Sequence, residues 1–235
     1  MYYIIIFYIG CIISSFLLWV ASESLHPSNH LLRRSKCDYC GHPLSYCDLF
    51  PLFSQVYHRS RCRYCQRSYS SLYLIGECMG GSLFLYLYFI YCSNLSINIF
   101  FLLLVSILLL LMSYCDLLEG WVPDKLQLLL AIIIFLFSPS LSELRLSSSH
   151  LIFYAFFLLL YLFFPSYIGG ADIKLFSLLI PLLEISTIPL FILAASSSAL
   201  LWVITCTQVL DKPIPRHIRF VPFIFFAFCI TFPFQ

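Results

Sequence analysis

The stretch Tyr167-Ile168-Gly169-Gly170-Ala171-Asp172-Ile173-Lys174-Leu175 lies between two long apolar runs and decides how the rest of the chain is interpreted. It places the carboxylate of Asp172 and the amine of Lys174 where a predicted membrane segment begins. An ionisable residue at such a border is costly unless it faces water, a partner or a substrate. The two glycines and the alanine before Asp172 let another backbone approach it closely. The stretch therefore raises the question of whether the chain supplies a second acid.

The composition excludes a soluble globular protein. Of the 235 residues, 61% are hydrophobic and only 10% are charged, against about 25% charged in a soluble domain. The apolar residues come in blocks of roughly 17–25, the length that crosses a bilayer as a helix, and nothing alternates as in an outer-membrane barrel. The first apolar run has no basic residue before it and no A-x-A site after it, so we expect a transmembrane helix rather than a cleaved signal peptide.

The apolar runs predict an all-α polytopic membrane protein with about eight transmembrane helices. These are expected at residues 2–21, 72–92, 98–115, 126–137, 150–164, 173–183, 187–210 and 221–234. The chain then divides into a first transmembrane helix (1–21), a polar loop with four paired cysteines (22–71), and a membrane core of about seven helices (72–235).

The basic residues predict the orientation. With eight helices and loop 22–71 in the cytoplasm, twelve Lys/Arg residues lie on the cytoplasmic side and only Arg145 lies opposite, as the positive-inside rule requires. Asp116 and Asp172 then share the cytoplasmic face. This result depends on the number of helices between them.

Two acids at one membrane face permit a specific chemistry. When Asp116 and Asp172 approach each other at low dielectric they share one proton. The ionised acid can then activate water while the protonated acid polarises a peptide carbonyl, as in aspartic proteases. The alternative is that each aspartate caps a helix end or faces headgroup water.

The sequence resembles the type IV prepilin peptidases in three motifs that occur in the family's order. Residues 169–175 (GGADIKL) resemble the second aspartate motif, G-x-G-D-x-K-L, with Ala171 in place of its second glycine. Residues 116–124 (DLLEGWVPD) resemble the first, and the cysteine loop is the third. The resemblance implies that Asp116 and Asp172 are the catalytic pair. It implies supporting roles for Asp124, Lys174, Gly169, Gly170 and Glu77.

The resemblance also implies a function. Such an enzyme is an aspartic endopeptidase of the bacterial plasma membrane, with its catalytic face in the cytoplasm. It cuts the short basic leader, after Gly, from prepilin-like precursors of type IV pili, protein secretion or competence. Its partners are these substrates and the lipid bilayer, with no nucleic acid. Some members also N-methylate the new N-terminus with S-adenosylmethionine. The serine-rich links and GGAD favour the competence type of Gram-positive bacteria.

The cysteine loop predicts a structural zinc site. Cys37 and Cys40 form one C-x-x-C pair, and Cys62 and Cys65 form a second, with 21 residues between the pairs, close to the usual spacing of paired zinc knuckles. Four thiolates bind zinc tetrahedrally and leave no open position for catalysis, and a cytoplasmic location disfavours disulfides. The alternative is two reduced thiol pairs without metal.

Three other functions fit parts of the pattern. A GxGD protease of the preflagellin or presenilin type would act on another substrate. A transporter would use membrane acids to relay protons, but these would be expected near the bilayer midplane, whereas Asp116 and Asp172 lie at the ends of predicted helices. A membrane scaffold with a zinc-knuckle domain would not need the aspartates.

Overall fold

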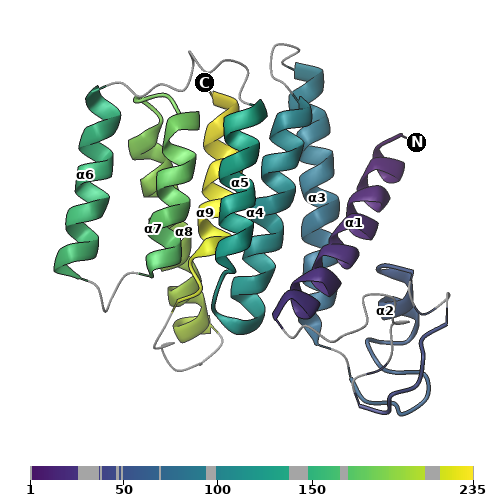
Figure 1. The fold of residues 1–235 in the computed structure, drawn as a ribbon. Helices are drawn as coiled ribbons and strands as arrows, with labels where there is room; N and C mark the ends of the chain where they lie inside the picture. The colour runs from purple at the N-terminus through teal and green to yellow at the C-terminus, as the bar shows by residue number, and fades with distance from the viewer. Residues whose placement is uncertain are drawn as a thin grey trace. The chain divides into compact units, whose positions relative to one another are not determined.

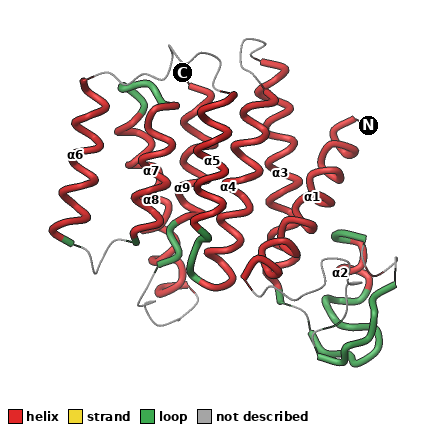
Figure 2. The backbone as a smooth tube through the Cα atoms, viewed as in Figure 1, coloured by secondary structure: helices red, strands yellow, loops and turns green. Residues whose placement is uncertain are grey.

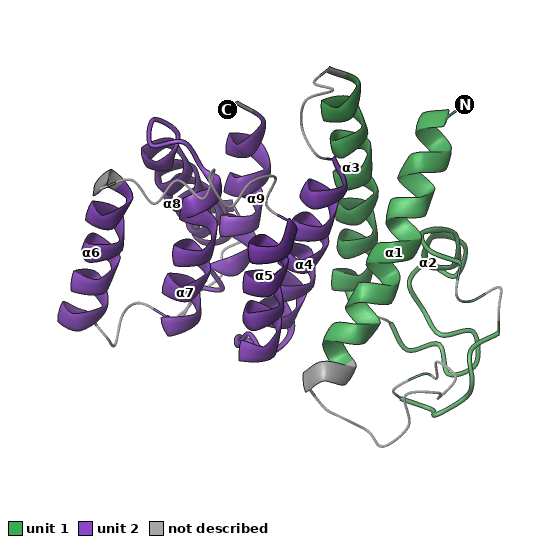
Figure 3. Ribbon diagram, turned by 45° about the horizontal axis from the view of Figure 1, so that its top comes forward, with its two compact units in different colours: residues 1–97 green, residues 98–235 purple. Residues whose placement is uncertain are grey.

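The computed structural model describes residues 2–25, 37, 39–45, 48, 50–68, 70–93, 99–137, 148–164, 169–209 and 218–234. These form two compact units, Met1–Ile97 and Asn98–Gln235 (Figure 3). Within the described residues the backbone consists of helices and connecting loops without a strand (Figure 2). The prediction of an all-α fold is confirmed.

The helices follow the predicted apolar runs (Figure 1). Unit 1 contains α1 (Tyr2–Leu25), α2 (Phe53–Tyr57) and α3 (Ser71–Ser93). Unit 2 contains α4 (Ile99–Glu119), α5 (Asp124–Phe137), α6 (Ser148–Phe163), α7 (Gly170–Leu179), α8 (Ile188–Ile204) and α9 (Val221–Thr231). The 3-10 turn η2 (Ile180–Leu182) follows α7, the π-helical turn η3 (Thr205–Val209) follows α8, and the 3-10 turn η4 (Phe232–Phe234) follows α9.

In unit 1, α1 and α3 form an antiparallel hairpin that packs through small residues. Tyr3 at the start of α1 stacks on Phe89 near the end of α3, with ring centroids 5.6 Å apart. A Cβ atom added to Gly10 would lie 2.6 Å from the Gly80 carbonyl oxygen. The Ser14 hydroxyl donates to the Gly76 carbonyl at 2.6 Å. Small residues let membrane helices approach closely and gain contact area, so these positions bring the two helices together.

In unit 2, α4 is the central helix, and most of its apolar side chains are buried. It packs against α5 and α9, while α7 contacts α5, α6 and α9. Leu109, Met112 and Tyr114 on α4 are almost completely buried. A largely buried helix can hold a polar group at a defined position, and α4 carries Asp116 near its C-terminal end.

The prediction of eight transmembrane helices is not supported. Each predicted run forms a helix, but among the described residues only four helices are long and apolar enough to cross a membrane: Tyr2–Ser22, Ser71–Cys92, Ile99–Glu119 and Ile188–Val209. The helices α5, α6, α7 and α9 have 14, 16, 10 and 11 residues. At about 1.5 Å per residue they are shorter than the ~30 Å hydrocarbon core.

The difference has a physical reason. The sequence count extended the apolar runs through residues that end or interrupt helices, such as Pro181, which lies in η2 after α7 has ended at Leu179. The twelve-to-one charge asymmetry assumed eight helices, so the orientation stays a prediction. The links at 26–36, 138–147 and 210–217, which carry several of the counted basic residues, lie outside the described residues.

Candidate active site and metal centre

Asp116 lies in the last turn of α4 and is buried, with 6% of its surface exposed. Helix α4 ends just after it because Gly120 takes a positive φ of 77°, which glycine adopts without steric cost at a helix C-terminus. The Asp116 Oδ2 atom accepts the backbone N–H of Val221 at 3.1 Å. The carboxylate therefore lies at the positive end of the α9 dipole, where a negative charge is stabilised.

Asp172 lies in the first turn of α7 and is half-buried. Gly169 is the N-cap residue, with extended backbone angles, and its carbonyl accepts the N–H groups of Asp172 and Ile173 at 3.1 and 3.3 Å. The carboxylate folds back over this glycine, because a Cβ atom at Gly169 would lie 2.8 Å from Asp172 Oδ2. At Gly170 the nearest atom to an added Cβ is Tyr161 Cε2 at 3.9 Å, an ordinary contact.

The negative charge of Asp116 influences the carboxyl group of Asp172. The C-terminal end of α4 and the N-terminal ends of α5, α7 and α9 lie at the same end of unit 2 (Figure 1). Asp172 lies outside the four candidate spans. Burial raises the pKa of the Asp172 carboxyl to about 7, and the negative charge of Asp116 acts in the same direction. A proton on Asp172 is thus favoured both by burial and by its neighbour.

The first turn of α5 holds the start of α7 in place. The Lys174 Nζ atom lies 2.7 Å from Asp124 Oδ1, and both side chains are exposed. The Gln127 amide, which is buried, donates to the Ala171 carbonyl at 3.1 Å. An exposed ion pair contributes about 0–1 kcal/mol to stability. The buried Gln127 hydrogen bond is therefore the contact that does more to hold the start of α7 in place.

Sequence reasoning missed three contributors to this site. The Val221 N–H contacts Asp116 directly, and the positive charge of Arg219 acts on the same carboxylate. Gln127 reaches the backbone of the aspartate motif. Its polar amide in an otherwise apolar run could have indicated a buried hydrogen bond, whereas the distant pairing of α9 with α4 has no local sequence signal.

In unit 1, the four paired cysteines lie together as predicted, and they can hold a metal ion. Their sulfur atoms all lie within 4.8 Å of one another, and the Sγ atoms of Cys37 and Cys65 are 3.8 Å apart. Sulfurs at the corners of a tetrahedron around zinc, each about 2.3 Å from it, are about 3.8 Å apart. The donor set and its spacing therefore fit a zinc ion with four thiolate ligands.

The two C-x-x-C pairs have the same backbone geometry. The N–H of Gly41 donates to the Cys37 carbonyl at 2.8 Å, and that of Gln66 donates to the Cys62 carbonyl at 2.9 Å. Gly41 and Gln66 both have positive φ angles, 69° and 59°. Each turn aims two thiols at one point, so the backbone geometry of the two turns brings the four thiols together.

The aromatic contacts repeat the same symmetry. Tyr39 and Tyr64 occupy the same position in the two C-x-x-C pairs. The His42 ring stacks on Tyr64 with centroids 3.6 Å apart, and the Arg67 guanidinium lies 5.0 Å from the centroid of the Tyr39 ring. Each half of the loop thus covers the tyrosine of the other half. The His42 ring therefore takes part in aromatic packing.

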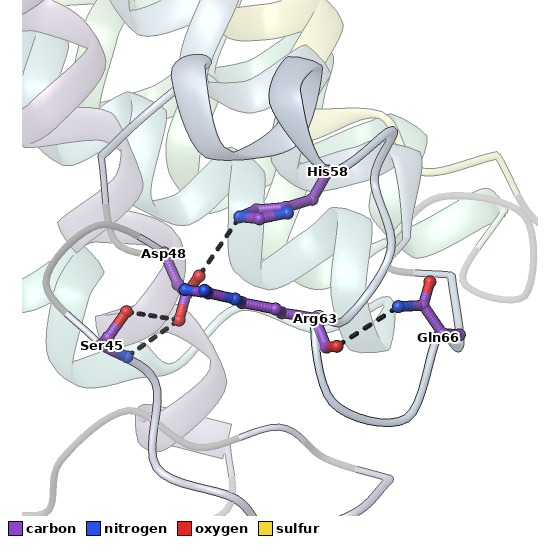
Figure 4. A network of polar contacts seen from close by, with 5 residues as sticks. All are labelled: Ser45, Asp48, His58, Arg63 and Gln66. Carbon is purple, nitrogen blue, oxygen red and sulfur yellow. Dashed lines mark hydrogen bonds and ion pairs between the residues drawn. The ribbon is translucent and has the colours of Figure 1, made fainter.

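A polar network in the same loop includes Ser45, Asp48 and His58 (Figure 4). The Ser45 hydroxyl and backbone N–H donate to Asp48 Oδ2 at 2.7 and 3.0 Å, and His58 Nε2 lies 3.4 Å from Oδ1. Burial raises the pKa of Asp48, but the Ser45 hydrogen bonds and the charges of His58 and Arg63 outweigh it, so the pKa lies below its ordinary value. The Asp48 carboxylate thus lies between Ser45 and His58 in the loop.

Glu77 lies on α3 in unit 1 and is buried. Its carboxylate accepts hydrogen bonds from the Leu52 N–H at 2.8 Å, from the Ser15 hydroxyl at 3.0 Å and from the Gln55 amide at 3.0 Å. These donors come from the loop, α1 and α2. Within the described part of unit 1, Glu77 therefore joins the cysteine loop to the helical hairpin.

Comparison with known families decides the identity of the chain. The model of the bacterial Peptidase A24 N-terminal domain matches residues 8–91. The model of the type IV leader peptidase family matches residues 102–204. The protein belongs to the type IV leader peptidase family. The resemblance read from the three motifs is confirmed.

The predicted site residues fall into the two matched segments. Residues 8–91 include the four cysteines and Glu77, and residues 102–204 include Asp116, Asp124, Asp172 and Lys174. Family membership supports a membrane-associated protease with prepilin leader peptidase activity. Searches among curated proteins and among solved structures gave no match.

Proposed function

We propose that the leader peptidase is an aspartic endopeptidase in which Asp116 and Asp172 share one proton. The observation that carries the proposal is the coupling between them: the charge of Asp116 contributes to the raised pKa of Asp172. The partners of the two acids differ. Asp116 receives the Val221 N–H and lies near the positive charge of Arg219, while the described contacts of Asp172 are with its own helix turn.

This asymmetry assigns roles to the two acids. Of the two acids, Asp116 is the one with a hydrogen bond from the Val221 N–H and a favourable effect of Arg219, both of which stabilise a charged carboxylate. We therefore assign Asp116 as the base that takes a proton from water. Asp172 retains its proton and donates it to the carbonyl oxygen of the scissile peptide as water attacks the carbon. In the second half of the reaction the C–N bond breaks, the leaving amine takes up the proton that Asp116 removed from water, and Asp172 regains a proton from a hydroxyl of the tetrahedral intermediate as the carboxyl product forms. No nucleophilic side chain is required.

The substrate class follows from the family and from the composition of the peptidase. We propose that the substrate is a prepilin-like protein with a short basic leader, a glycine at the cleavage point and an apolar helix that lies in the bilayer. The catalytic end would face the cytoplasm in the bacterial plasma membrane. The basic loops would repel a basic leader, so recognition would rest on the apolar helix. The resemblance alone suggests that the substrates belong to type IV pili, protein secretion or competence. The same holds for N-methylation with S-adenosylmethionine.

Substitution of the two acids tests the proposal. The full chain is co-expressed with a prepilin-like substrate that the parent cleaves, and the cleaved fraction is measured on a gel. Asp116→Asn and Asp172→Asn should each lower cleavage by at least about 100-fold, as expected for loss of an acid or base. Glu119→Gln, an exposed acid one turn from Asp116 on α4, is the matched control and should cleave at the parent rate.

The outcome separates the alternatives. Loss of cleavage in both Asn variants, with each protein still in the membrane fraction, supports the aspartate pair. Cleavage that survives in either variant means that this aspartate is a helix cap, and another group must then perform the chemistry.

A further inference from the structure

The short helix α2 exposes large apolar side chains beside the membrane hairpin of unit 1. Phe53, Val56 and Tyr57 are 73%, 71% and 83% exposed, and Phe50 just before α2 is 53% exposed. Four large side chains exposed within eight residues form a patch that a water-soluble loop rarely shows. We therefore expect this patch, Phe50–Tyr57, to be covered by a binding partner or by lipid.

The position of the patch along the hairpin identifies the occupant. Leu52 and Gln55 are hydrogen-bonded to Glu77, which also accepts from Ser15. Glu77 lies six residues inside the candidate span that begins at Ser71, and Ser15 lies seven residues inside the span that ends at Ser22. At 1.5 Å per residue both positions are about 10 Å from the end of a span. The two spans, of 21 and 22 residues, are about as long as the ~30 Å hydrocarbon core is thick, so the segment bonded to Glu77 lies within reach of the acyl chains.

The patch continues the lipid-facing surface of α1. A cavity of about 860 Å³ is lined by Tyr8 of α1 together with Phe50, Phe53 and Tyr57, and its other lining residues are Ser54, His58 and Arg63. The neighbours Ile5, Ile9 and Ile12 on α1 are 51%, 45% and 47% exposed. In a helix that spans a bilayer, such side chains contact lipid, and the patch joins them through Tyr8.

The backbone of the segment is suited to a low-dielectric environment. The Leu52 N–H donates to Glu77 at 2.8 Å. The N–H groups of Ser54, Val56 and His58 donate to backbone carbonyls at 2.9–3.0 Å. Unpaired backbone groups are costly in the bilayer, and these four groups have acceptors within the protein.

The charges of the loop indicate which lipid headgroups would lie beside the patch. The described residues of the loop between 37 and 70 carry four arginines, Arg59, Arg61, Arg63 and Arg67, all exposed, against the single acid Asp48. Three of these arginines follow α2 directly. Basic residues next to a membrane-inserted apolar segment attract anionic lipids.

We propose that Phe50–Tyr57 is a membrane anchor that inserts into the bilayer interface and that the arginines after it bind anionic phospholipid headgroups. The anchor does not depend on the catalytic role of the aspartates. It holds the cysteine loop against the membrane surface at a fixed depth.

Photocrosslinking tests the anchor. A photoreactive phenylalanine analogue replaces Phe53 or Tyr57 in the full chain, and the protein is illuminated in nanodiscs of phosphatidylcholine with phosphatidylglycerol. Phe16, an exposed α1 residue, is the lipid-facing control, and Tyr39, exposed in the cysteine loop, is the water-facing control. Positions 53 and 57 should give lipid adducts at a yield close to that of position 16, and at least about tenfold above position 39.

The headgroup part has its own test. Changing Arg59 and Arg61 to Gln should reduce the share of phosphatidylglycerol among the adducts at position 57 to its share in the nanodisc. Adducts at 53 and 57 no more frequent than at position 39, while position 16 labels normally, would overturn the anchor. Crosslinks from 53 and 57 to a co-expressed prepilin-like protein instead of lipid would also overturn it. A phosphatidylglycerol share that never exceeds that of the nanodisc in the parent would overturn the headgroup assignment.

Discussion

Gly169 determines where the Asp172 carboxylate lies. The carboxylate occupies the space that a side chain at residue 169 would fill, with Oδ2 only 2.8 Å from an added Cβ. The backbone angles of Gly169, φ −64° and ψ 128°, suit any residue. The glycine is therefore needed for space rather than for backbone conformation, and substitution should move the carboxylate and leave the helix start unchanged.

Gly169→Ala should reduce cleavage of a prepilin-like substrate by about 10- to 100-fold, because a 1 Å misplacement of a catalytic group costs on that order. The thermal unfolding midpoint of the purified protein should stay close to that of the parent, since the displaced group is the end of a flexible side chain. Cleavage rate and unfolding are measured on the same preparation.

Gly170→Ala is the matched control for this prediction. An added Cβ at Gly170 would meet only Tyr161, at 3.9 Å, so cleavage should remain within a few-fold of the parent rate. Equal activity of the two variants would show that the space over Gly169 is not used.

At the scale of elements, the cysteine loop and the α1–α3 hairpin are joined through one buried carboxylate. Glu77 accepts one hydrogen bond from each of the loop, α1 and α2. The Leu52 backbone has a positive φ of 62°, which is unusual for a residue with a side chain. The Leu52 N–H bond to Glu77 compensates for this conformation, so the loop depends on the carboxylate.

Glu77→Ala should release the loop from the hairpin. The substitution leaves the Leu52 N–H and the Gln55 amide without their acceptor, which costs about 1–3 kcal/mol. Trypsin added to membranes should then cleave after Arg59 and Arg61 faster than in the parent.

Cys78→Ala, the next residue on α3, is exposed and should leave the digestion rate unchanged. A Glu77→Ala protein that is digested at the parent rate would contradict the role of Glu77 as the joint between loop and hairpin.

At the scale of the whole molecule, each unit builds its own site from its own contacts. The cysteine cluster is formed by two loop segments of unit 1. The aspartates of unit 2 are held by α4, α5, α7 and α9. Damage to the cluster should therefore remain within unit 1.

The purified protein should hold about one zinc ion per chain, as expected for a four-thiolate structural site. Cys62→Ser should abolish the zinc signal and make the loop sensitive to trypsin, while the fragment that contains α4–α9 remains resistant. Metal analysis and the digestion pattern are the two measurements.

Cys92→Ser, an exposed cysteine outside the cluster, should retain the metal of the parent. Zinc that is absent from the parent, or retained in Cys62→Ser, would contradict the assignment.

Local patterns were enough to predict much of this peptidase. The apolar runs predicted helices at the right places because burial and backbone hydrogen bonding act over one turn at a time. The C-x-x-C spacing predicted the cysteine cluster because each turn positions its own two thiols. The motifs at residues 116–124 and 169–175 predicted the family because they keep their order along the chain.

Local sequence patterns did not predict the number of membrane-spanning helices. An apolar run indicates that a segment avoids water, but not whether a helix of full membrane length forms. Pro181 shortened α7, and Gly120 and Pro123 separated α4 from α5. Where a run contains such residues, the length of the helix depends on what the surrounding structure tolerates.

The sequence by itself determined the class of the protein, its family, the helix positions and the cysteine cluster, because these depend on composition and short spacing. Only the tertiary structure decided that Val221 is paired with Asp116, that Gln127 reaches the aspartate motif, and that Glu77 joins the loop to the hairpin. These contacts join residues 105, 44 and 25 positions apart. Their partners are chosen by the packing of helices, which short-range patterns do not encode.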